Sequence, residues 1–171
     1  MAIVEADLEF RMSGGASNTD VNAALGGAMS TVGGGVITTN VLNNDMDDIT
    51  GTEASAGITI YHAYYYKNNH GSLSWLSPVF WIDSQTTSAT TDVAVALSDE
   101  AKNTTMETIG SETTAPSGPS FTTPANKAAG LALTTLAFSE YRGIWARYVV
   151  TAGTTAVLDS YTIKAEGDTN P

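Results

Sequence analysis

Short runs of β-branched and aromatic residues recur along the whole chain, and turn-forming residues bound each run. In the first, ADLEFRM (6–12), apolar residues alternate with Glu9 and Arg11, as in a strand with one buried face. The others are GITIYHAYYYKN (57–68), LSPVFWID (76–83), DVAVAL (92–97), YRGIWARYVV (141–150) and SYTIKAE (160–166). The pattern predicts an all-β fold, an antiparallel β-sandwich of the jelly-roll or immunoglobulin-like kind.

Charged residues make up only 15% of the 171 residues, so long amphipathic helices are not expected. The length fits one domain over residues 1–171, with long Gly-, Thr- and Ser-rich loops and an extended N-terminal loop segment at about 13–50. Two stretches can each hold one helical turn. They are 19–31, capped by Asp20 and stopped at Gly26, and 123–133. The three-proline region 111–124 is either an exposed connection or an ordered arm.

Two segments repeat the same order of residue types. IYHAYYYKNN (60–69) and EYRGIWARYV (140–149) both place a tyrosine, a basic-type residue, a small residue, aromatic residues and a cation in that order. Each is followed, after a turn that contains glycine, by a second strand-like run. We interpret this as a duplicated hairpin within one sandwich.

The charge balance argues against several partners. With 7 basic and 18 acidic residues, the net charge is −11 and the surface should repel nucleic acid and anionic lipid. The absence of cysteine excludes disulfides, thiolate catalysis and cysteine-ligated zinc. No signal-peptide pattern and no run of about 18 apolar residues is present, so we expect a protein made in the cytoplasm without membrane association.

The glycine-rich stretch SGGASNTDVNAALGG (13–27) raises the question of a phosphate-binding loop. No lysine follows its glycines, as a P-loop requires, and Gly14 and Gly15 are adjacent, which breaks the dinucleotide-binding spacing. We therefore expect an irregular loop packed on the sandwich, and we assign no cofactor.

An acidic stretch, NNDMDDITGTE (43–53), is the best candidate for a cation site. Asn43, Asp45 and Asp47 have the spacing of a calcium loop. However, Asp48 stands where the sharp turn needs glycine, and Ala54 stands where the last carboxylate belongs. We favour a solvated acidic turn and assign no metal ligands.

No motif indicates catalysis. His62 and His70 are the only histidines, and they lack the spacing of a metalloprotease helix. The chain has no Gly-x-Ser-x-Gly elbow, and no pair among its acidic residues stands out as a glycosidase pair. We expect His62 to be half-buried and hydrogen-bonded, and we assign no catalytic residues.

Aromatic residues cluster in the strand at 57–68. Period 2 places Tyr64 and Tyr66 on one face and Tyr61 and Tyr65 on the other. We expect one set to fill the core and the other to be exposed, for a protein interface or for carbohydrate stacking.

The sequence resembles a family of tailed-bacteriophage virion structural proteins. Members open with Asp-Leu-x-Phe/Leu-Arg-Leu/Met, Ser-Gly-Gly-Ala-x-Asn-Thr and Leu-Gly-Gly, and close with Tyr-Arg-x-x-Trp-x-Arg and Val-Glu-Gly-Asp-Thr. The matching positions are Asp7 to Met12, Ser13 to Thr19, Leu25 to Gly27, Tyr61 to Asn68, Tyr141 to Arg147 and Glu166 to Thr169. His62 replaces the usual arginine of a central Tyr-Arg-x-x-Tyr strand, so any salt bridge of that arginine is in doubt here.

The resemblance implies a non-enzymatic component of the phage particle. We expect a capsid decoration or cement protein that binds the major capsid protein on the outer head surface and forms homo-dimers or trimers. The glycine loop would then act as a strap whose backbone groups seek partners on neighbouring chains. The alternatives are a neck, tail or baseplate adaptor, a carbohydrate-binding receptor module, and a glycan-cleaving enzyme.

Overall fold

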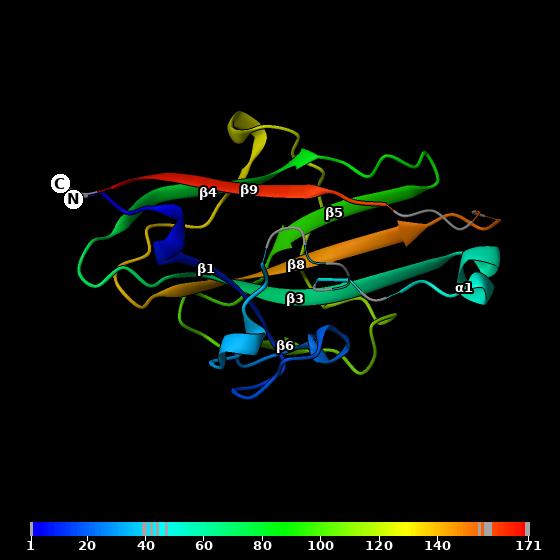
Figure 1. Ribbon diagram of the computed structural model, residues 1–171, viewed down its shortest axis with the longest axis horizontal. Helices are drawn as coiled ribbons and strands as arrows, with labels where there is room; N and C mark the ends of the chain where they lie inside the picture. The colour runs from blue at the N-terminus through cyan, green and yellow to red at the C-terminus, as the bar shows by residue number, and fades with distance from the viewer. Residues whose placement is uncertain are drawn as a thin grey trace.

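A computed structural model describes residues 2–38, 41, 43, 45–46, 48–153, 155 and 159–169, and it confirms the all-β prediction (Figure 1). A four-stranded sheet has the order β1-β3-β8-β5, a three-stranded sheet has the order β7-β4-β9, and β2 pairs with β6; all described pairs are antiparallel. The strands are β1 (Leu8–Met12), β2 (Gly26–Gly27), β3 (Ile58–Asn68), β4 (Trp75–Ser84), β5 (Thr91–Leu97), β6 (Met106–Thr108), β7 (Leu131–Ala132), β8 (Tyr141–Val150) and β9 (Thr162–Thr169).

In the described part of the chain, helical structure is confined to short segments. They are the α-helix α1 (Gly51–Ala56) and the 3₁₀ turns η1 (Glu5–Asp7), η2 (Val21–Ala23), η3 (Gly33–Gly35) and η4 (Lys127–Ala129). The two helical turns predicted from sequence correspond to η2 and η4. The Asp20 side chain caps η2 as predicted, but the turn ends at Ala24 and not at Gly26. None of the described helices has the length and apolar character needed to cross a bilayer.

The internal repeat is visible in the strand pairing, but not as two hairpins. β3 pairs with β8, so that Tyr61 faces Arg147 and Tyr65 faces Gly143, while β4 pairs with β9 in the other sheet. Each copy therefore contributes one strand to each sheet. The hairpin interpretation was wrong because both edges of β3 are occupied, by β1 and β8, which leaves no edge for β4.

The main core lies between the two larger sheets. It joins Tyr64 and Tyr66 of β3 to Phe80 of β4, with the Tyr66 and Phe80 rings 6.1 Å apart. A second cluster lies on the opposite face of the four-stranded sheet and contains Tyr65 and Trp145, both with 0% of their surface exposed. The expectation of one exposed aromatic face was therefore wrong, because other segments of the chain cover the second face.

The region 111–124 is an ordered arm that forms part of this cover. Val95 and Thr122 exchange two backbone hydrogen bonds, of 2.8 and 2.9 Å, which fixes the arm along the edge of β5. The Phe121 ring lies 5.5 Å from that of Tyr61 and 5.3 Å from the Arg147 guanidinium carbon. Tyr61, one of the aromatic residues that could have been exposed at an interface, thus packs against the arm within the chain.

We predict that Tyr65→Phe destabilises the fold by about 1–3 kcal/mol, because it leaves buried backbone groups without a partner. The Tyr65 hydroxyl donates to Gly27 O at 2.6 Å and accepts from Met106 N at 2.9 Å, so it joins β2 and β6 to the sheet. Denaturant unfolding measures the change in the free energy of unfolding.

Tyr141→Phe is the matched control. Its ring packs against that of Tyr65 at 5.3 Å, and its hydroxyl makes no hydrogen bond within the described part of the chain. The control should change stability by less than about 0.5 kcal/mol. Equal effects of the two substitutions would contradict the role given to the Tyr65 hydroxyl.

Candidate functional site

The segment 13–35, which we call the glycine cover, lies over the second face of the four-stranded sheet. It is anchored to β3, since Ser13 N donates to Ala63 O at 3.1 Å and Ala63 N donates to Ala24 O at 2.7 Å. Ser13 is fully buried, and its hydroxyl accepts from Gly26 N at 2.9 Å. The cover is therefore a packed part of the domain, as predicted from sequence.

Two polar side chains hold the glycine cover together from inside. Asn18 Nδ2 donates to Ser13 O at 2.6 Å, and Asn18 Oδ1 accepts from Asp20 N at 3.0 Å. The fully buried Ser30 hydroxyl donates to Asn18 O at 2.7 Å. Because buried polar groups need partners, these bonds account for the fully buried Ser13 and Ser30 and for the half-buried Asn18.

The glycines allow this close packing. Gly14, Gly15, Gly26 and Gly27 all have positive φ, between 79° and 106°. A Cβ atom on Gly26 would lie 1.7 Å from Glu107 O, and one on Gly14 would lie 2.2 Å from Ala23 O. Glycine is therefore required at Gly14 and Gly26 both for positive φ and for close approach of the backbone.

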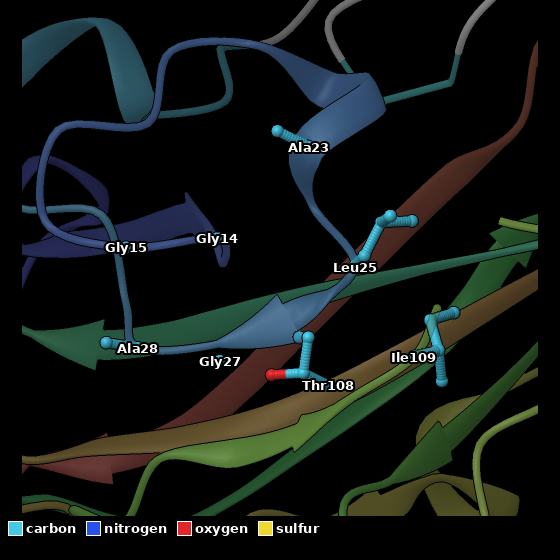
Figure 2. Close-up of a pocket in the computed structure, with 9 residues that line it drawn as sticks. Gly14, Gly15, Ala23, Leu25, Gly27, Ala28, Thr108 and Ile109 are labelled. Atoms are coloured by element: carbon cyan, nitrogen blue, oxygen red, sulfur yellow. The ribbon is translucent and has the colours of Figure 1, made fainter. Parts of the chain in front are cut away.

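A depression of about 390 Å³ lies where the glycine cover meets β6 (Figure 2). Glycine and alanine residues line it, together with Leu25, Thr108 and Ile109, and none of these lining side chains carries a charge. Two nearby amides are already bonded within the chain, since Gly14 N donates to Gly26 O at 2.8 Å and Gly15 N to Ala28 O at 2.9 Å. The depression has no cation to hold a phosphate.

The same bonds limit which backbone groups of the glycine cover could bond to a neighbouring chain, as a strap would. The amides of Gly14, Gly15 and Gly26 find their acceptors inside the chain, so they do not seek partners on a neighbouring molecule. The physical reason is that the glycine cover shields Tyr65 and Trp145, and burial there requires its backbone groups to be paired.

The acidic stretch 43–53 does not form a solvated turn as a whole. Asp47 lies outside the described residues, and Asp48 is exposed. Asp45 instead turns inward, where its carboxylate accepts a hydrogen bond from the Tyr161 hydroxyl. Burial raises the pKa of the Asp45 carboxyl, although that bond opposes the rise. Among the described residues, no three acidic, histidine or cysteine side chains gather as metal ligands would.

Around Asp45 lies a buried polar cluster that the sequence did not reveal. Tyr148 OH contacts Tyr161 OH, and Tyr64 OH donates to the Asp45 carbonyl. Burial raises the pKa of all three tyrosine hydroxyls well above their ordinary value, so they act as neutral hydrogen-bonding groups. Asp45, Tyr148 and Tyr161 line a cleft of about 1250 Å³ between the two larger sheets.

His62 belongs to this cluster and is more buried than expected, with 0% of its surface exposed. Its Nδ1 lies 3.1 Å from Asp45 O, and since a carbonyl only accepts, Nδ1 carries the proton. Its Nε2 lies 3.7 Å from a Glu112 carboxylate oxygen. Burial lowers the pKa of His62, with the Asp45 bond and the Glu112 charge opposing.

The second histidine has a separate, local role. His70 Nδ1 accepts from Ser72 N at 3.1 Å and from Leu73 N at 3.0 Å, which shapes the turn between β3 and β4. The two histidines therefore form no joint site. Among the described aromatic residues, Phe138 alone is exposed, at 52%, whereas Tyr61, Phe121, Tyr141 and Tyr161 are half-buried.

Comparison with protein-family models, with curated proteins and with solved structures found no match to this chain.

We predict that Gly26→Ala costs about 3 kcal/mol or more, because left-handed strain adds to a backbone clash. Gly15→Ala is the matched control. Its φ is +106°, but a Cβ there meets nothing within 4 Å. The control should cost only about 1–2 kcal/mol, from strain alone. Chemical denaturation of both variants tests this, and equal losses would show that the close approach at Gly26 contributes nothing.

We also predict that His62→Gln reduces the sensitivity of the fold to acid. Below the ordinary histidine pKa of about 6.5, the unfolded chain takes up a proton that buried His62 resists, so stability falls as pH falls. The fall in Tm between about pH 7.5 and pH 5.5 should be smaller in the variant than in the parent. Parallel curves of Tm against pH for the two proteins would contradict this prediction.

Proposed function

We propose that this chain is a non-enzymatic structural protein of a phage particle, a decoration or cement protein that binds the outside of the head. The observation that carries the proposal is where the segments that resemble virion proteins lie. Five of the six, Asp7–Met12, Ser13–Thr19, Leu25–Gly27, Tyr61–Asn68 and Tyr141–Arg147, are far apart in sequence, yet they lie in or against the four-stranded sheet. The sixth, Glu166–Thr169, lies in β9 of the three-stranded sheet.

Contacts between these segments account for their residue types. Arg11 of β1 faces Tyr65 of β3, whose hydroxyl bonds to Gly27 of the glycine cover. Gly143 of β8 faces the same tyrosine, and a Cβ on Gly143 would lie 2.6 Å from the Met106 side chain. Packing within the domain therefore accounts for the residue types at these matching positions. This favours a shared structural role over a shared catalytic one.

The charge supports a position on the outside of the head. A net charge of −11 disfavours contact with packaged DNA, whereas the outer surface imposes no such cost. A protein of this kind holds its shell by contacts that are modest for each copy and are repeated over many seams. The major capsid protein is the expected partner.

The first test is binding to expanded, empty heads of the phage that encodes the chain, measured as copies per shell. We expect saturation at hundreds of copies. Binding of a few copies at one vertex, or none, would overturn the head assignment, and a few copies would favour a neck, tail or baseplate adaptor. Heat-unfolded protein is the control for nonspecific adsorption.

Heat tolerance of the shells gives a second test. Shells that lack the protein should assemble but rupture at a lower temperature than shells saturated with it, because its binding adds contacts across subunit seams. Light scattering or dye release during heating measures the rupture temperature. Identical rupture temperatures with and without the protein would contradict a cementing role.

A further inference from the structure

β9 is the open edge of the sandwich. The chain itself covers the edges of the four-stranded sheet, because Ile37 N donates to Phe10 O at 2.8 Å beside β1 and Thr122 pairs with Val95 of β5. β4 lies between β7 and β9. Among the described residues, no backbone–backbone hydrogen bond joins Thr162–Thr169 to any strand other than β4, and Ile3 N donates to Thr169 Oγ1 at 3.3 Å at its C-terminal end. An edge of this kind is a template for another strand.

Side chains of opposite charge stand on either side of Ala165 in β9. Lys164 and Glu166 flank it, and both project from the exposed face. Ile163 and Gly167 are the next pair, on the half-buried inner face. When two copies of this Lys-Ala-Glu segment run antiparallel, the lysine of each copy lies opposite the glutamate of the other. A twofold interface requires self-complementarity of this kind.

We propose that two copies of this chain pair β9 against β9 in antiparallel fashion, about a twofold axis at Ala165. In that register, Lys164 of each copy lies opposite Glu166 of the other, and Ile163 lies opposite Gly167. Opposite charges stabilise directly opposed positions of an antiparallel pair, and Gly167 places no side chain against Ile163. The three-stranded sheets join into one continuous sheet across the dimer.

The existing ion pairs extend this match. Within each chain, Lys164 Nζ lies 2.8 Å from Asp83 Oδ2, and Lys127 Nζ lies 2.5 Å from Glu166 Oε1. The Lys164 and Glu166 side chains remain 55% and 61% exposed, so each can take a second partner. The dimer then carries two rows of alternating charge, each running Asp83, Lys164, then Glu166 and Lys127 of the other copy.

Long-range repulsion between the two acidic copies does not prevent this pairing. Each chain carries a net charge of −11, but at about 0.15 M ionic strength charges more than about 8 Å apart are largely screened. Opposed side chains on paired strands are closer than that. We therefore expect dimers in physiological salt.

The test uses complementary charge reversals. Lys164→Glu and Glu166→Lys each place like charges opposite each other twice in the dimer, so each variant alone should dimerise about tenfold or more weakly than the parent. An equimolar mixture should recover dimers of mixed composition, because each unlike pair is restored. Sedimentation measures the masses, and native mass spectrometry identifies the mixed species.

Lys102→Glu is the matched control for charge, since it breaks the Lys102–Glu140 pair, which lies away from β9. It should leave dimerisation unchanged. A parent protein that is monomeric or trimeric, or variants that dimerise as well as the parent, would overturn the proposal. Variants that fail to recover in the mixture would also overturn it. Dimerisation and shell binding are measured separately, so either can fail while the other holds.

Discussion

The rest of the structure depends on the pairing of β3 with β8 and on the burial of both faces of that pair. Tyr64 faces the main core, whereas Tyr65 and Trp145 face the second cluster, and all three are fully buried. A sheet that is apolar on both faces needs a layer on each side. The three-stranded sheet forms one layer, and the glycine cover with the arm 111–124 forms the other.

This requirement explains much of the unusual composition. A second layer made of loops brings many backbone amides and carbonyls against an apolar face, where each must find a partner. Glycine allows those loops to lie close to the sheet, and Ser13, Asn18 and Ser30 supply bonds that a regular strand would have provided. The glycine-rich stretch therefore follows from how the sheet is covered, and it needs no ligand to account for it.

The strands could be predicted because alternation and turn residues are local signals, as the match of 141–150 with β8 illustrates. The burial of both faces of β3 was predictable in part. The unbroken run Tyr64, Tyr65, Tyr66 departs from alternation in the way that fully buried strands do. The burial of Asp45 could not be predicted, because its partner Tyr161 lies far along the chain and no local pattern links the two residues. The pairing of the two repeats with each other likewise depends on which edges are free in three dimensions.

The order of the strands along the chain has a consequence for biosynthesis. β3 ends at Asn68, but its main partner, β8, begins only at Tyr141. The central pair cannot close until most of the chain has emerged from the ribosome, and non-local strand pairing is intrinsically slow. During that interval the tyrosines of β3 lack their final neighbours, and unpaired apolar strands are prone to aggregation. The nascent chain is therefore most vulnerable before β8 is available.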